Sequence, residues 1–161
     1  MARWTTDVAA LILRLAAGLI FLPHGWAKVA GEGGAAAFAA DMAANYHVPT
    51  LLGHLAAWSE VVGAVLLIAG LLTRVDAFLL ACTMFVAAFI VQLPDALYEV
   101  QPGAIKTFVA LRGIETPLAM FAICAALVLM GGGRVSLDAL FSGLLRRKSQ
   151  LSNAAAEAAA K

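Results

Sequence analysis

Charged side chains are scarce in this chain. Only 13% of its 161 residues are Asp, Glu, Lys or Arg, whereas 63% are apolar. A soluble domain carries about a quarter charged residues and about half apolar ones, so this composition excludes an ordinary soluble domain. The formal net charge of +1 shows no excess of basic residues, and nucleic acid is therefore not expected as a partner.

The motifs of several common catalytic and binding sites are also missing. The sequence has no Gly-rich phosphate loop, no H-E-x-x-H, no G-x-S-x-G and no C-x-x-C. Its two cysteines, Cys82 and Cys124, lie within apolar runs at a similar predicted depth. We interpret them as free core cysteines, with a redox pair as the alternative. No metal site and no covalently bound cofactor are expected.

What the sequence does contain is long apolar runs. A membrane-spanning helix needs about 20 mainly apolar residues. Proline and consecutive glycines predict where such helices end, because both disrupt a helix. The runs that approach this length are residues 8–22, 51–72, 75–93 and about 105–130. The sequence therefore predicts an all-α protein, a four-transmembrane-helix bundle that forms a single membrane domain over residues 1–148.

The start of the fourth helix has two interpretations. The uncharged stretch 116–130 spans only about 22 Å as a helix, which is short for a bilayer. A start near Ile105 gives sufficient length and draws Arg112 and Glu115 into the membrane. In the alternative, Thr116 is the N-cap and Pro117 the first helical residue, which gives a short helix at the bottom of a funnel.

The distribution of basic residues predicts the orientation. The N-terminus, the second loop and the C-terminal segment carry more Lys and Arg than the other two loops, so the positive-inside rule places both termini in the cytoplasm. An alanine-rich stretch from Gly34 to Tyr46 predicts a short interfacial helix in the outer first loop. Residues 136–148 predict an amphipathic helix on the inner surface, with a basic end suited to anionic lipid. Residues 149–161 are similar to a helical linker or tag.

Two ionisable residues are expected at the same depth in the membrane. Arg14 lies nine positions before Pro23, and Glu60 lies nine positions after Leu51, so each is about 13 Å from the outer end of its helix. A charge within a span costs a few kcal/mol unless it has a partner. We therefore predict a buried Arg14–Glu60 ion pair. The longer fourth helix would add Glu115 as a second carboxylate about 15 Å down.

Polar residues near the outer ends of the helices predict a funnel that opens outward. His24 and Lys28 follow the first apolar run and would line its mouth. A structural role is the alternative, because a buried Arg–Glu pair also fixes the register of two helices. The candidate residues for a ligand or proton site are Arg14, His24, Lys28, Glu60, Arg112 and Glu115.

Three segments, taken in order, resemble the DoxX family of small four-helix bacterial membrane proteins. They cover most of the chain from Leu11 to Leu140 and include Gly25, Ser136 and Asp138 as motif residues. GIE at residues 113–115 resembles the acidic position that precedes the fourth helix in the family. Two local departures are GGGR in place of the commoner Gly-x-Gly form and Pro23 before the histidine. The segments are LILRLAAGLIFLPHGWAKVAG, HVPTLLGHLAAWSEVVGAVLLIAGLLTR and GGGRVSLDAL.

The resemblance implies a four-helix fold in the bacterial inner (plasma) membrane. For some members it implies a membrane subunit of sulfur- or quinone-linked oxidation, including thiosulfate:quinone oxidoreductase. In that role a quinone would enter the funnel, Arg14 and Lys28 would stabilise negative charge, and Glu60 or Glu115 would handle protons.

Two other functions stay open beside the redox role. One is a non-catalytic membrane anchor or assembly partner for a soluble oxidoreductase, which the absence of cofactor motifs favours. The other is a small-solute or proton transporter. Four helices leave little room for a transport route, so a transporter would need to be a homo-oligomer.

Overall fold

The computed structural model describes residues 2–98 and 106–159, and within them the chain is helical without strands. The π-helical segment η1 continues α4 into α5, so these three elements form one rod from Thr73 to Tyr98. The prediction of an all-α protein is confirmed. The elements are α1 (Ala2–Ala30), α2 (Gly34–Tyr46), α3 (Thr50–Ala69), α4 (Thr73–Val86), η1 (Ala87–Gln92), α5 (Leu93–Tyr98), α6 (Lys106–Met130) and α7 (Leu137–Ala159).

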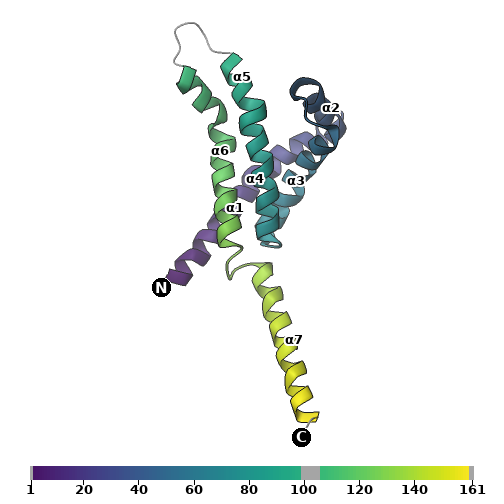
Figure 1. Cartoon of the computed structure of the whole chain (residues 1–161), viewed down its shortest axis with the longest axis vertical. Coiled ribbons are helices and arrows are strands. Elements are labelled where there is room, and N and C mark those ends of the chain that lie inside the picture. The colour runs from purple at the N-terminus through teal and green to yellow at the C-terminus, as the bar shows by residue number, and fades with distance from the viewer. Residues whose placement is uncertain (1, 99–105, 160–161) are drawn as a thin grey trace.

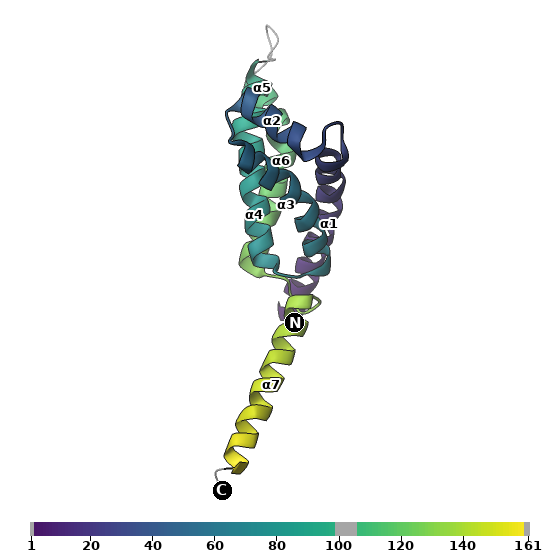
Figure 2. The same cartoon turned by 90° about the vertical axis from the view of Figure 1, so that its right-hand side faces the viewer.

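Four helices are long and apolar enough to cross a membrane. They stand side by side as a bundle in which α1 packs on α3, α3 on α4, and α4 on α6 (Figures 1 and 2). The core between them contains many small side chains, which permit the close helix packing that lipid-embedded bundles favour. The four-helix prediction is confirmed. The spans are Trp4–Ala30, Thr50–Ala69, Thr73–Tyr98 and Leu111–Met130.

The two ends of the bundle differ in what covers them. Helix α2 lies across one end, and the chain termini lie toward the other (Figure 2). We call these the α2 end and the N-terminal end. Helix α2 has the bounds predicted for the interfacial helix, and it packs closely on α3 because Gly53 leaves room for Ala39. The structure thus confirms a short helix in the first loop.

Two prolines do not end helices where the sequence predicts. Helix α1 continues through Pro23 to Ala30, and Pro94 lies inside α5. A proline removes one backbone hydrogen bond, but neighbouring helices hold a membrane helix together across such a break. The predicted end of the first span at residue 22 is therefore wrong by two helical turns. The second span ends at Ala69, because Gly70 takes the left-handed conformation with φ 70°.

The fourth span agrees with the longer of the two interpretations. Helix α6 begins at Lys106 and contains Pro117, so the short helix capped by Thr116 is wrong. The predicted start at Ile105 lies just outside the described residues. The longer helix carries Arg112 and Glu115 on its surface.

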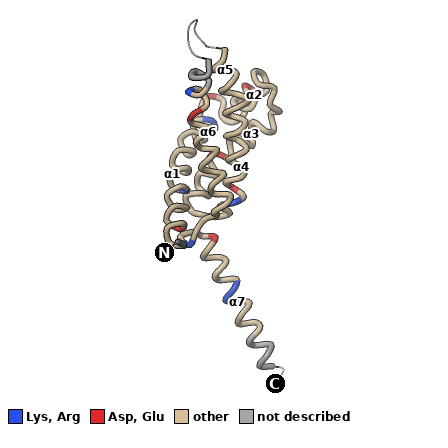
Figure 3. Tube along the Cα trace, turned by 60° about the vertical axis from the view of Figure 1, so that its left-hand side comes forward, with Lys and Arg blue, Asp and Glu red and all other residues tan. Residues whose placement is uncertain are grey.

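The predicted C-terminal helix is present. Helix α7 leads away from the N-terminal end of the bundle (Figures 1 and 3). Its side chains from Leu140 to Asn153 are exposed, so the bundle does not hold it down. Residues 149–159, interpreted as a linker or tag, continue the same helix.

Candidate functional site

Three glycines set how α1 and α3 pack in antiparallel register. Gly25 lies against the backbone of Glu60, Gly18 lies against Ala64 and Ile68 near the C-terminal end of α3, and Gly70 just after α3 meets the guanidinium of Arg14. A Cβ added at any of them would collide with the opposite element. This close approach places Arg14 at the N-terminal end and Glu60 toward the α2 end.

The ion pair at the α2 end joins Lys28 to Glu60. Lys28 Nζ donates to Glu60 Oε1 at 2.5 Å, and the side chains are 26% and 2% exposed. The same ammonium lies 5.0 Å from the ring centroid of Phe38 in α2, a favourable cation–π arrangement. Glu60 Oε2 has no hydrogen-bond partner among the described residues. The carboxylate therefore has one oxygen bound and one available.

A cavity of about 640 Å³ surrounds this pair. Helices α1, α2 and α6 and the rod formed by α4 and η1 all contribute to its wall. The wall is largely apolar by area, and its polar side chains are His24, Lys28, Glu32, Asp41, Glu60, Gln92 and Thr116. This volume and a mainly apolar wall with convergent polar groups are typical of small-molecule sites.

The structure brings together three of the six predicted site residues. His24, Lys28 and Glu60 line the cavity. Arg112 and Glu115 are exposed on α6 and do not line it, although the next residues of α6, Thr116 and Pro117, do. The α6 residues expected to add charge to the site instead face outward from the bundle.

The predicted Arg14–Glu60 ion pair is wrong. Arg14 is 1% exposed, and its Nη2 donates to the carbonyl of Val135 at 2.5 Å. The prediction placed the end of the first helix at Leu22, whereas α1 continues to Ala30. These extra residues move Arg14 about 12 Å further from the α2 end than predicted. Lys28 takes its place as the partner of Glu60.

Asp138 joins α7 to the turn between α3 and α4. Its Oδ1 accepts from Leu72 N at 2.7 Å, and its Oδ2 accepts from Thr73 N at 2.9 Å. Its own backbone N donates to Gly70 O at 3.0 Å. A carboxylate in this position satisfies the free N–H groups at the start of α4 and complements the helix dipole. Asp138 is thus a cap supplied from a distant part of the chain.

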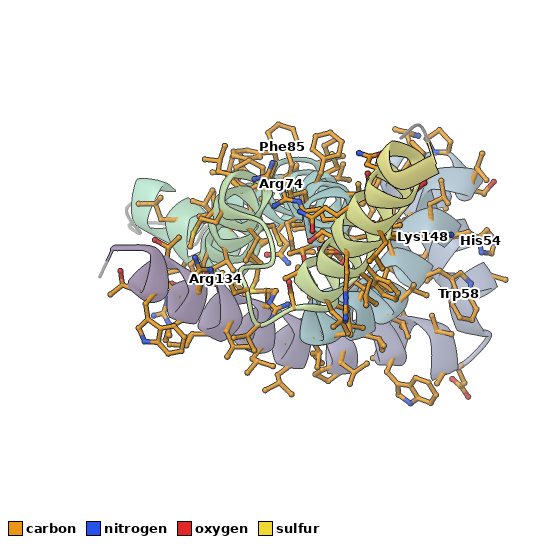
Figure 4. All side chains as sticks on the ribbon, turned by 90° about the horizontal axis from the view of Figure 1, so that it is seen from below. His54, Trp58, Arg74, Phe85, Arg134 and Lys148 are labelled. Atoms are coloured by element: carbon orange, nitrogen blue, oxygen red, sulfur yellow. The ribbon has the colours of Figure 1, made fainter. Side chains whose placement is uncertain are left out.

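Ser136 holds the glycine-rich loop that precedes α7. Its Oγ donates to Gly133 O at 2.6 Å and accepts from Ala139 N at 3.2 Å. The same loop is fixed to α1, because Asp7 Oδ1 accepts from Arg134 N at 3.0 Å. Figure 4 shows Arg134 and Arg74 in the view onto this end of the molecule. The motif residues Ser136 and Asp138 therefore serve structural contacts.

Sequence reasoning missed two residues near the site. Phe38 faces Lys28, and the available signal was its large aromatic ring in an alanine-rich helix. Asp76 was not among the candidate residues, but it is 5% exposed. The available signal was its place inside the predicted span 75–93, where a charge is costly unless it has a partner.

His54 and Trp58 do not line the cavity. Figure 4 shows both side chains directed away from the bundle on the outer face of α3. Trp58 is 50% exposed. Within the described residues no three His, Cys, Asp or Glu side chains lie close enough to hold a metal ion.

Comparison with known proteins identifies the family. The DoxX family profile matches residues 9–93, which is more than half of the chain. The Bacillus subtilis (strain 168) protein named "Putative oxidoreductase CatD" is 32% identical over 87 residues, which cover 54% of this chain and 62% of that protein. The chain thus aligns with less than two thirds of that relative's length. No solved structure gives a significant match. The chain belongs to the DoxX family.

Proposed function

We propose that this protein is a membrane subunit of a redox system and that its cavity binds the head group of a quinone or quinol. The observation that carries the proposal is the Lys28–Glu60 ion pair, which lies in a mainly apolar cavity of about 640 Å³. The relative named as an oxidoreductase adds support for redox chemistry.

The two members of the pair offer complementary hydrogen-bonding groups. Lys28 Nζ carries three N–H donors and uses one on Glu60, so others remain for a quinone carbonyl. Glu60 Oε2 has no partner among the described residues and can accept from a quinol hydroxyl. Phe38 beside Lys28 and the methionines Met84 and Met120 supply apolar surface for a ring. Polar groups set in a mainly apolar wall are what an amphipathic ligand requires.

The orientation in the membrane is part of the same proposal. The excess of Lys and Arg at the N-terminus, in the second loop and around α7 favours a cytoplasmic position for the N-terminal end. The α2 end, with its cavity, then faces the outside of the bacterial inner membrane. A quinone would enter from the lipid near this surface.

Thermal unfolding of the purified protein in detergent tests quinone binding. Decylubiquinone should raise the unfolding temperature in a concentration-dependent way, because a ligand at 100 times its Kd stabilises the folded state by about 2.7 kcal/mol. Lys28→Met and Glu60→Gln should each remove most of this rise. Arg112→Met and Glu115→Gln remove the same charges from the exposed face of α6 and should retain it.

Two results would refute quinone binding at this site. One is an unfolding temperature that does not change with either decylubiquinone or its reduced form. The other is an equal loss of the effect in the α6 variants, which would show that the response does not come from the cavity.

A second candidate function has its own observation. Helix α7 extends from the bundle with Leu144, Leu145 and the basic residues 146–148 exposed, so it could dock a soluble enzyme (Figure 3). A pull-down from native membranes should then recover a soluble oxidoreductase and lose it when residues 140–161 are deleted. Recovery of the same enzyme by the shortened chain would exclude this role for α7.

A further inference from the structure

Buried polar atoms without protein partners continue from the cavity toward the N-terminal end. Among the described residues, they belong to side chains that are at most 5% exposed and that come from α1, α3 and α4. Asp7 Oδ2, at the N-terminal end, also has no hydrogen bond but lies 3.5 Å from Arg134 Nε. The other atoms are Glu60 Oε2, Asp76 Oδ2, Thr73 Oγ1, Arg14 Nε and Arg14 Nη1.

The first step of this series leads from Glu60 to Asp76. Gly63 lies three residues after Glu60 on the same face of α3, which is about 4.5 Å further along the helix. A Cβ at Gly63 would lie 2.7 Å from Asp76 Oδ1. The carboxyl group of Asp76 therefore reaches into the α3–α4 contact about one turn below Glu60, in space that only a glycine leaves free.

The second step leads from Asp76 to the N-terminal end. Thr73 precedes Asp76 by three residues and shares its face of α4. A Cβ at Gly132 would lie 2.7 Å from Thr73 Oγ1 and 3.0 Å from Ser136 Cβ. Ser136 in turn lies beside Gly70, where the Arg14 guanidinium is found. The polar side chains thus follow one another from the cavity to the glycine-rich loop, about one helical turn apart along α3 and α4.

Buried polar atoms without protein partners lower the free energy of unfolding, so a purely structural role does not explain this series. Each buried polar atom without a partner costs about 1–3 kcal/mol, and more if it is charged. Apolar residues of similar size would fill the same space at lower cost. Water molecules are the usual partners of buried polar atoms that the protein does not satisfy. Carboxyl groups within membrane-spanning helices are rare, and proton relays and ion pathways are among the functions that they mark.

We propose that Glu60, Asp76 and Thr73, with water between them, form a proton path that joins the cavity to the N-terminal end of the bundle. At rest Glu60 is a carboxylate paired with Lys28, and Asp76 is a carboxylic acid. Asp76 releases its proton through the Thr73 hydroxyl and water toward the N-terminal end, and Glu60 takes up a proton from water in the cavity. Glu60 then passes that proton through water to the Asp76 carboxylate, so one O–H bond forms and one breaks on each carboxyl group and both return to their starting state.

Arg14 does not carry the proton in this scheme. Its guanidinium stays protonated and donates hydrogen bonds to the water at the N-terminal end of the path. The nearby carboxylate of Asp138 offsets its charge, so a proton can approach. The path depends on the buried groups alone and not on which ligand occupies the cavity.

Proton flux into liposomes tests the path. Liposomes that contain the full chain and an internal pH-sensitive dye receive a valinomycin-driven potassium potential, and the internal pH is followed. The wild-type chain should acidify or alkalinise the interior faster than protein-free liposomes. Asp76→Asn should reduce the rate to the protein-free value, and Thr73→Val should reduce it partly.

Matched variants on the same rod separate the path from general damage. Asp95→Asn changes an exposed carboxylate that binds Tyr46, and Thr83→Val removes a hydroxyl that donates to Leu80 O of its own helix. Both should conduct at the wild-type rate. A wild-type rate no faster than protein-free liposomes would overturn the proposal. Equal rates for wild type and Asp76→Asn, or equal losses in Thr73→Val and Thr83→Val, would also overturn it.

Infrared spectroscopy provides a second measurement that does not depend on flux. A protonated carboxyl band should shift when H₂O is replaced by D₂O, and Asp76→Asn should remove that band. Persistence of an identical spectrum in Asp76→Asn would show that Asp76 never holds a proton. Size-exclusion profiles that match wild type establish that each variant is folded.

Discussion

The two ends of the bundle use the same kinds of residue for different purposes. At the α2 end, Lys28 and Glu60 bind each other inside a cavity, and each retains hydrogen-bonding capacity. At the N-terminal end, Asp138 and Ser136 bind backbone groups of loops and helix ends. Charged groups that bind side chains in a cavity remain available to a ligand. Polar groups that bind the backbone hold loops and helix ends in place.

Glycine has two roles in the molecule. Gly25 near the cavity permits close contact between helical backbones. Gly70, Gly131 and Gly133 at the N-terminal end have φ near 70°, and Gly33 and Gly34 at the α2 end have φ of 73° and 62°, a conformation that other residues adopt only with strain. Glycines with positive φ therefore shape the loops at both ends, whereas the contacts of the charged side chains differ between the ends. Four substitutions would break or sharpen this comparison.

The largest effect is expected for Gly70→Ala. A Cβ at this position would be strained by the positive φ and would collide with the buried guanidinium of Arg14. The free energy of unfolding should fall by about 3 kcal/mol or more, measured by denaturation in mixed detergent micelles. Gly143→Ala is the matched control, because nothing lies within 4 Å of a Cβ in that exposed helix. Similar losses in both variants would contradict this account.

The next largest effect is expected for Asp138→Ala. The substitution leaves the N–H groups of Leu72 and Thr73 without their acceptors and leaves the charge of Arg14 without its nearest offset. The loss of unfolding free energy should be about 2–3 kcal/mol. Asp138→Asn retains one acceptor oxygen and should lose less. The explanation as a cap fails if the asparagine variant is as unstable as the alanine variant.

A smaller effect is expected for Lys28→Met, which leaves the buried Glu60 carboxylate without its partner. The loss should be about 1–3 kcal/mol, and adding Glu60→Gln should restore part of it, because the two residues are coupled. Arg14→Met combined with Glu60→Gln should instead give additive losses, since these residues do not touch. A coupling in the Arg14 cycle as large as that in the Lys28 cycle would contradict the observed pairing.

The smallest effect is expected for Tyr46→Phe at the α2 end. Tyr46 Oη donates to Asp95 Oδ2 at 2.7 Å, and this hydrogen bond is the main cause that raises the pKa of Tyr46. Its stabilising contribution, about 0.5–1 kcal/mol, is complete below the ordinary tyrosine pKa near 10 and is lost as pH rises through the raised value. The difference between wild type and variant, followed by unfolding from pH 7 to alkaline pH, should shrink. A constant difference would exclude the hydrogen bond as its source.

The sequence by itself determined the architecture of this protein. Long apolar runs form helices in lipid, because the hydrocarbon offers no hydrogen-bond partners and the backbone N–H and C=O groups of the run must bind one another. Composition and run length therefore predicted the all-α fold, and the alanine-rich segment Gly34–Tyr46 predicted α2 within its bounds. The motif residues also identified His24, Lys28 and Glu60, which the structure places in one cavity.

Only the tertiary structure decided which charged residues meet. Whether α1 ends at Pro23 or continues through it depends on neighbouring helices that support the broken hydrogen bond, and a local pattern does not report this. Because α1 continues past Pro23, Arg14 lies at the N-terminal end of the bundle and Lys28 forms the ion pair with Glu60. The depth of Asp76 has the same origin, because its burial follows from the space that Gly63 leaves on another helix.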